Sequence, residues 1–581
     1  MGATCNAAQT FLALVTSLIN TPAPENYYYT RRGGGTFDFI VVGAGSAGCV
    51  LANRLSEVPE WSVLLLEAGG EEPFEADIPG MLSVPWGTRM DWAYHTQPGV
   101  ICGGLECPVI RGKGLGGSSS INAMLYVRGN KRDYDHWAEL GNTGWDFESV
   151  LPYFKKSENN LDPDINNDTE YHNTGGYQTV QRFPYQDENV KHLVRAFREI
   201  GVKEVDYNGK QQLGYMLAQA TQKGGLRQST NRAFLEPVRN RKNLKVVTGV
   251  RVTKVLIRPG TNTAYGIVCV EEKDHEQVKI FLAHNEVILS GGAINSPQLL
   301  MLSGIGPKEV LQPLKIPVIK DLKVGENLQD HASTPGVFFM YGKYKEQNMD
   351  DIFLNSLKYS QPNREGPWTA TGTNQVVAYA NSKYANKSID YPDLMIFFIS
   401  LDARDESEQN KIVFYSTFLR PKSRGKVTLQ SADPFSQPLI YPNYFTDPDD
   451  IKRHLDSFNF AKKLAETTTL KEAGFVLNTT YMPTEEDFKT GKNPFWRDPE
   501  NFSQFSNFHL SGTCKMGPAT DPTAVVSPTL RVHGIRNLRV IDVSIMPYVV
   551  SANTNAPTIM IAEKGADMIK KYWTSKLNKV K

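Results

Sequence analysis

The chain is poor in net charge, in cysteine and in long apolar runs, and each shortage excludes a class of protein. Its 63 basic and 62 acidic residues leave a net charge of +1, so it lacks the basic surface that nucleic-acid binders use. The longest apolar run near the start, 11–19, is too short to cross a bilayer, and no membrane span is predicted. With 40% hydrophobic and 22% charged residues, the composition is that of a globular protein and not of a disordered or fibrous one.

The apolar run at 11–19 has two interpretations. Helical spacing relates Phe11, Leu14, Val15, Leu18 and Ile19, which favours an amphipathic helix on the domain surface. The tail of a signal peptide is the alternative, but there is no basic start and no clear cleavage site. On the helix interpretation, any natural signal has already been removed.

Six cysteines among 581 residues do not form a disulfide scaffold. Cys102 and Cys107 lie in a glycine-containing loop, where they either close a small disulfide or remain free thiols. Cys514 is interpreted as a buried packing thiol. No set of histidines, cysteines and carboxylates has metal-ligand spacing, so no metal site is predicted. Glycosylation sequons occur at Asn167, Asn386, Asn478 and Asn501, and alone they decide little.

A nucleotide-binding pattern begins at residue 38. A short apolar strand, 38–42, leads directly into Gly43-Ala-Gly45-Ser-Ala-Gly48. A helical stretch follows, and a second strand over 62–66 ends at Glu67. The alternative, a glycine-rich turn in an unrelated sheet, explains neither the second strand nor the acid. This order therefore predicts dinucleotide binding.

Each part of the pattern has a mechanical reason. Gly43 makes the tight turn, Gly45 lets the backbone approach a pyrophosphate, and Gly48 lets the helix pack closely on the sheet. The helix start offers free N–H groups and the positive end of its dipole. Glu67 can accept hydrogen bonds from ribose hydroxyls.

A second glycine hexad, Gly112-Lys-Gly-Leu-Gly116-Gly117, lacks a following strand with an acid. We expect it to be a loop pressed against the same cofactor. One dinucleotide in so long a chain favours a bound flavin over a flavin and nicotinamide pair.

Four motifs in order carry a family resemblance: 112–135, 292–306, 509–517 and 553–558. With them the chain resembles the glucose–methanol–choline (GMC) oxidoreductases, flavoenzymes that oxidise alcohols, over about 37–572. It is most similar to the arthropod glucose-dehydrogenase-like branch, which is largely secreted. The resemblance therefore favours a secreted glycoprotein in which Cys102 and Cys107 are bonded.

The resemblance implies an α/β fold. A Rossmann-like FAD-binding domain with a parallel central sheet would be interleaved with a smaller α+β substrate domain of sheet plus helices. The expected segments are an extension (1–36), the FAD-binding domain (37–331, with inserted segments around 150–220), the substrate domain (332–505) and a return to the FAD-binding domain (506–575). Within the second motif's strand-to-helix turn, Ser296 is expected to cap a helix over 298–303 with Pro297 in its first position.

Catalysis is expected at His509 and Asn553, which the resemblance places beside the flavin N5. The alcohol proton must leave as the hydride moves, and a neutral His509 can take it. Asn553 would donate a hydrogen bond to the developing alkoxide. The helix start at 555–558 would stabilise the reduced, anionic flavin. The alternatives are a loop histidine bonded to backbone and a helix-capping asparagine.

Most of the predicted FAD contacts come from the glycine loops and the C-terminal motifs. The predicted contacts are Gly43, Gly45, Ser46, Ala47, Gly48, Glu67, Ala68, Gly112, Gly116, Gly117, Ser118, Asn122, Ala123, Met124, Leu125, Val252, Asp542, Asn555, Pro557 and Thr558. Some relatives tether the flavin through a histidine in the first motif. Ile121 stands at that position here, so non-covalent FAD is expected.

The substrate is the least determined feature. Phe502, Phe505, Phe508 and Tyr548 lie near His509 or Asn553 in sequence, which favours a small aromatic or benzylic alcohol or a cyanohydrin, unless these rings are core. Oxygen is narrowly preferred as the acceptor over a quinone. The alternatives are a glucose-type sugar dehydrogenase with a quinone acceptor, a hydroxynitrile lyase with a non-redox flavin, and an inactive flavin binder. Nothing in the sequence predicts an oligomeric state.

Overall fold

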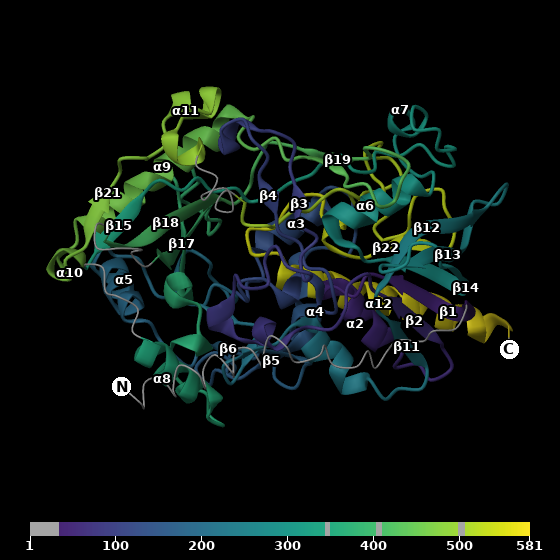
Figure 1. Ribbon diagram of the computed structural model, residues 1–581, viewed down its shortest axis with the longest axis horizontal. Coiled ribbons are helices and arrows are strands. Elements are labelled where there is room, and N and C mark those ends of the chain that lie inside the picture. Colours follow the sequence, from purple (N-terminus) through teal and green to yellow (C-terminus); the bar gives the residue numbers. More distant parts are fainter. Residues whose placement is uncertain (1–33, 343–348, 402–408, 498–505, 581) are drawn as a thin grey trace.

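The computed structural model describes residues 34–342, 349–401, 409–497 and 506–580. The helix expected over 11–19 lies outside these residues, as do Phe502 and Phe505. Two sheets lie at opposite ends of the longest axis of the molecule (Figure 1).

The larger sheet is mixed. Its strands β11 (Leu244–Val247), β2 (Val63–Leu66), β1 (Gly35–Val42), β14 (Val278–Leu289) and β22 (Leu538–Val540) run parallel to one another. Two further strands, β13 (Thr263–Glu271) and β12 (Val250–Arg258), add to it in antiparallel sense. The predicted Rossmann-like sheet is thus confirmed, with an antiparallel extension.

This sheet is buried on both faces where its parallel strands β1 and β2 pair. The last four residues of β1 and all of β2 are buried, as continuous apolar runs in covered parallel sheets are. Helices α2 (Ser46–Leu55) and α12 (Asn555–Val580) lie side by side on this sheet (Figure 1). A buried ion pair between Arg54 and Glu563, 2.8 Å long, joins them.

The second sheet is antiparallel throughout and has six strands in the order β21-β15-β18-β17-β16-β7. Their bounds are β7 (Gly214–Leu217), β15 (Phe338–Tyr341), β16 (Val376–Ala380), β17 (Leu394–Leu401), β18 (Asn410–Phe418) and β21 (Val476–Asn478). Strand β7 comes from the segment expected as an insertion in the FAD-binding domain. The antiparallel substrate-domain sheet agrees with the predicted fold class.

Side-chain alternation gives this sheet two apolar faces. Ile396 and Phe398 of β17 pack with helices α5 (Glu188–Glu199) and α9 (Pro448–Ala465). The residues between them point to the opposite face, where they are free to line a cavity.

The remaining elements connect and cover the two sheets. They are α3 (Lys131–Glu139), α4 (Phe147–Ser157), α6 (Gly292–Leu302), α7 (Lys308–Leu311), α8 (Met349–Ser360), α10 (Thr468–Glu472), α11 (Glu485–Thr490), β3 (Tyr94–His95), β4 (Pro108–Val109), β5 (Glu158–Asn160), β6 (Gln178–Arg182), β8 (Gln219–Ala220), β9 (Gln222–Lys223), β10 (Leu226–Arg227), β19 (Lys426–Thr428) and β20 (Leu439–Tyr441).

Helix α6 begins six residues before the predicted start at 298. Ser296 is inside the helix and donates its hydroxyl to Asp542 at 2.6 Å, while the Gly292 N–H donates to the same carboxylate at 2.8 Å. The expected cap at Ser296 was wrong because a carboxylate distant in sequence caps the helix instead.

Cys102 and Cys107 are bonded to each other, with their Cα atoms 5.9 Å apart. The predicted disulfide is therefore present. Cys514 is buried, as expected of a packing thiol, and burial raises its pKa well above the usual value. None of the helices described is long and apolar enough to cross a membrane.

Candidate active site

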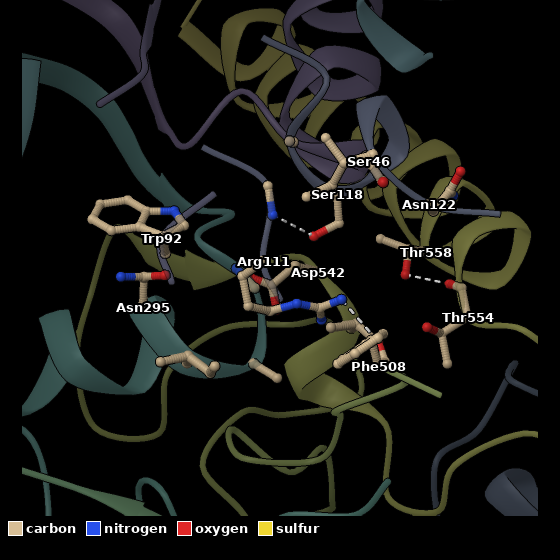
Figure 2. Close-up of a pocket in the computed structure, with 18 of the residues that line it drawn as sticks. Ser46, Trp92, Arg111, Ser118, Asn122, Asn295, Phe508, Asp542, Thr554 and Thr558 are labelled. Atoms are coloured by element: carbon tan, nitrogen blue, oxygen red, sulfur yellow. Dashed lines mark hydrogen bonds between the residues drawn. The ribbon is translucent and has the colours of Figure 1, made fainter. Parts of the chain in front are cut away.

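A cavity of about 340 Å³ lies between the two sheets. Its wall includes the carboxyl ends of three parallel strands, at Val42, Leu66 and Leu289. Ligands of open α/β sheets bind at this edge. The cavity is therefore where the fold offers a dinucleotide site, and Figure 2 shows part of its wall.

The first glycine turn is shaped by close backbone contacts. Gly43 has a φ of +97°, which favours glycine, and a Cβ on Gly48 would lie 1.8 Å from the Gly43 oxygen. Gly48 thus packs helix α2 against the turn. A Cβ on Gly45 would meet nothing nearer than 3.9 Å, so the Gly45 backbone faces open space.

The second glycine loop lies directly against the first. The Gly116 N–H donates to the Ala44 oxygen at 2.8 Å, and a Cβ on Gly117 would lie 2.7 Å from the Gly45 Cα. Figure 2 shows Ser118 of this loop bonded to the Gly112 N–H. The two glycine loops thus form one cradle of backbone atoms, and a side chain at these glycines would occupy its space.

Three helices begin at the cavity wall. Ser46 of α2 donates its hydroxyl to Asn555 of α12 at 2.8 Å, which brings the two N-termini together. Gly292 starts α6 at the same cavity. Converging N–H groups and dipoles favour an anion, so a glycine cradle at these helix starts fits the pyrophosphate of FAD.

Two buried carboxylates organise this wall. Glu67 accepts hydrogen bonds from the Ala44 N–H at 2.8 Å and the Gly69 N–H at 2.9 Å, and burial raises its pKa. Asp542 caps α6, and burial raises its pKa also. Both carboxylates line the cavity. Glu67 also fixes the first glycine turn at Ala44, and Asp542 fixes the start of α6 at Gly292.

Most predicted site residues line this one cavity. They are Gly43, Gly45, Ser46, Ala47, Glu67, Ala68, Gly112, Gly117, Ser118, Asn122, Ala123, Met124, Leu125, Val252, His509, Asp542, Asn553, Asn555 and Thr558. Gly48, Gly116 and Pro557 lie behind the wall. Gly48 and Gly116 make the backbone contacts described above, and Pro557 sits in the first turn of α12, where its missing N–H costs no hydrogen bond.

His509 lies in a chain of hydrogen bonds. Its Nδ1 is 2.9 Å from Nδ1 of His331, and Nε2 of His331 is 2.9 Å from the Leu419 oxygen. A carbonyl only accepts, so Nε2 of His331 carries the proton and its Nδ1 is an acceptor. His509 must then carry its proton on Nδ1, which leaves Nε2 with a free lone pair.

That lone pair faces the second predicted catalytic residue. Nδ2 of Asn553 lies 3.1 Å from Nε2 of His509. Burial, and then the positive charges near it, hold the pKa of His509 well below 6.5; burial lowers the pKa of His331 to about 4. Both imidazoles are neutral at neutral pH, so His509 presents a base to the cavity.

The sequence did not predict a role for His331. The only available signal was its position at the boundary drawn between two domains, among just ten histidines. Its role depends on the Leu419 carbonyl at the end of a strand of the other sheet, which a linear pattern does not contain.

The cavity wall on the side of the antiparallel sheet is largely apolar and aromatic. Strands β17 and β18 contribute Met395, Phe397, Ile399 and Tyr415, and connecting segments add Leu82, Trp86 and Phe508. The rings of Phe397 and Tyr415 stack with centroids 5.0 Å apart. Tyr548 is not part of the wall, because it is 42% exposed and lies against His136. Its expected place in the pocket was wrong, whereas Phe508 does line it.

The described residues contain no group of three or more histidines, cysteines and carboxylates that could hold a metal.

Known proteins resemble this chain in both sequence and fold. Residues 37–333 and 421–562 match the family described as GMC oxidoreductase. A glucose dehydrogenase [FAD, quinone] from Drosophila pseudoobscura pseudoobscura is 42% identical over 94% of this chain and 88% of its own. An alcohol dehydrogenase [acceptor] from Pseudomonas putida is 37% identical over 92% of this chain and 95% of its own. The crystal structure of pyridoxine 4-oxidase from Mesorbium loti superposes with a TM-score of 0.78 at 26% identity, covering 91% of this chain and 98% of its own. With the glycine cradle and His509 in one cavity, these matches lead to one conclusion: the chain belongs to the GMC oxidoreductase family and acts on CH–OH donors with FAD.

Proposed function

We propose that this protein is a dehydrogenase that oxidises a sugar-type alcohol and passes the electrons to a quinone-type acceptor. The observation that carries the oxidation of an alcohol is the lone pair on Nε2 of His509, which the contacts with His331 and Leu419 orient at the cavity. The sugar donor and the quinone acceptor rest on the 42% identity to an insect glucose dehydrogenase. A neutral, buried imidazole with a fixed tautomer is the group that removal of an alcohol proton requires.

One region of the cavity would bind FAD, and the opposite region would bind the substrate. The glycine cradle and the helix starts at Ser46 and Asn555 would hold the pyrophosphate of FAD, and Glu67 the ribose. Bound FAD supplies the acceptor for the substrate hydride. The antiparallel sheet covers the opposite side and keeps water from the substrate carbon.

The chain's own residues handle the proton. Nε2 of His509 takes the hydroxyl proton of the substrate, and the amide of Asn553 turns from His509 to the developing alkoxide. His331 keeps the other nitrogen of His509 protonated, so that the base does not change tautomer. Neither step needs a metal ion.

Two observations favour different donors. The 42% identity to an insect glucose dehydrogenase favours a sugar and a quinone. The aromatic wall of Trp86, Phe397 and Tyr415 favours the second candidate, a benzylic alcohol, which would gain about 25 cal/mol for each Å² of apolar surface that it buries.

The test is to compare glucose with benzyl alcohol under one quinone acceptor. A site that bonds the hydroxyls of a sugar should reject an alcohol without them, so glucose should have the higher kcat/KM by at least about tenfold. A higher kcat/KM for benzyl alcohol would replace the proposal with the second candidate. Repeating the assay with oxygen alone tests the acceptor, and hydrogen peroxide formed at the same rate would make the protein an oxidase.

We also propose that FAD is bound without a covalent bond. Ile121 lines the cavity at the position where some relatives carry the tethering histidine, and its side chain cannot form that bond. Acid precipitation of the holoprotein should therefore leave the yellow colour in the supernatant. Colour that stays with the pellet would contradict non-covalent binding.

We further propose that the protein is secreted, because the Cys102–Cys107 disulfide is typical of an oxidising compartment. Two sequons, at Asn167 and Asn386, are exposed. Peptide mass spectrometry of protein from its natural source should find glycan at one of them, and unmodified asparagine at both would count against secretion.

A further inference from the structure

The peptide group between Phe508 and His509 is held at both of its poles by charged side chains. Its carbonyl oxygen accepts a hydrogen bond from Nη2 of Arg111 at 2.8 Å. Its N–H donates to Oδ1 of Asp330 at 2.7 Å. Figure 2 shows the guanidinium of Arg111 reaching Phe508 beside the cavity. One cation and one anion thus hold the amide that leads into the base.

This amide needs holding because Phe508 has a φ of +59°. A bulky residue rarely adopts the left-handed region, and such strain persists where the surroundings enforce it. The Phe508 N–H donates to the Ser506 hydroxyl at 2.8 Å, and that hydroxyl donates to Oδ2 of Asp330. If the backbone relaxed, the His509 side chain would turn away from its present direction.

Neither charge is neutralised by a direct ion pair. Among the described residues, the guanidinium of Arg111 forms no ion pair within 4.0 Å, and it otherwise donates only to its neighbour, the Ile110 oxygen. Asp330 accepts from the hydroxyls of Tyr444 and Ser506. The charges of Arg111 and Asp330 act on each other across the amide between them, and Asp91 acts on Arg111 more weakly.

We propose that Arg111 and Asp330 are positioning residues that clamp the 508–509 amide and so set the direction in which His509 presents Nε2 to the substrate. The role rests on the proposed function of His509 as the base. Arg111 directly precedes the glycine hexad at 112–117. The clamp therefore connects this cofactor-binding loop to the segment that carries His509.

Four groups face His509: His331 at Nδ1, Asn553 at Nε2, and Arg111 and Asp330 at its backbone. The positive charge of Arg111 lowers the pKa of His509 and also that of Asp330, which burial raises to about 6. Removing that charge raises both pKa values. The acid limb of the pH profile of flavin reduction must then move to higher pH, whichever group titrates.

The test uses the holoenzyme and stopped-flow flavin reduction by its best alcohol. Arg111→Met and Asp330→Ala should each slow reduction about 10²-fold, the cost of a small misplacement of a catalytic group. Because both hold one amide, the double variant should lose far less than the product of the two effects. Arg111→Met should also move the acid limb to higher pH, whereas Arg111→Lys and Asp330→Asn should recover most of the rate.

Arg424→Met is the matched control. Arg424 is also a partly buried cation that donates to main-chain oxygens, those of Pro421 and Ser423, but it does not contact the 508–509 amide. It should leave the acid limb in place. An unmoved limb in Arg111→Met, or effects that simply multiply, would overturn the clamp.

A crystal structure of Arg111→Met holoenzyme separates this proposal from the proposed function. A displaced His509 imidazole supports the clamp even if no alcohol reduces the flavin of the wild-type protein. An imidazole in its original position overturns the clamp even if alcohols are oxidised.

Discussion

Replacing His509 with alanine should slow flavin reduction by alcohol about 10²- to 10⁴-fold, the usual contribution of a general base. The imidazole is the group that takes the substrate proton, and its contact with His331 orients the Nε2 lone pair at the cavity. In the wild-type enzyme, the pKa of His509 lies well below 6.5. The rate should therefore be flat through neutral pH and fall only in acid, as the imidazole gains its proton. Stopped-flow reduction across a pH series measures both effects.

His136→Ala is the matched control, because His136 is a surface histidine whose imidazole pairs with Glu139. It should reduce at the wild-type rate. Near-wild-type reduction in His509→Ala with an intact flavin spectrum would remove His509 from the mechanism.

Gly45→Ala should fold but bind FAD roughly 5- to 150-fold more weakly. The new methyl would meet no protein atom nearer than 3.9 Å, so the apoprotein has room for it. It would occupy the cradle between the two glycine loops, and overpacking of this kind costs about 1–3 kcal/mol. Fluorescence titration of the apoprotein with FAD gives the affinity, and thermal melting shows whether the apoprotein fold is intact.

Alanine substitutions at two other glycines, Gly48 and Gly70, serve as controls for this prediction. At Gly48 a Cβ would lie 1.8 Å from the Gly43 oxygen, so Gly48→Ala should lower the melting temperature of the apoprotein itself. At Gly70 a Cβ would meet nothing within 4 Å, so Gly70→Ala should change neither property. Wild-type FAD affinity in Gly45→Ala would contradict the assignment of the cradle to the pyrophosphate.

Local patterns in the sequence were sufficient for the nucleotide half of the fold. Strand β1, the turn at Gly43–Gly48, helix α2 and Glu67 follow one another without a break. Each part has its own backbone or burial requirement, so a short stretch of sequence specifies the unit.

Contacts between distant segments could not be predicted in this way. The start of α6 depends on Asp542, the tautomer of His509 on Leu419, and the direction of its backbone on Arg111. Two rings of the aromatic wall, Phe397 and Tyr415, likewise come from β17 and β18, whereas Tyr548, chosen because it is near Asn553 in sequence, faces solvent. Nearness along the chain was a poor guide wherever the site joins the two sheets.

The most direct test of the account is to add a panel of alcohols anaerobically to the holoprotein and watch the visible absorption band of the flavin. At least one alcohol should bleach the band, and a quinone should restore it. An unchanged band in the presence of every alcohol, while a chemical reductant still bleaches it, would contradict the account. Cleavage of a cyanohydrin without bleaching would identify a lyase instead.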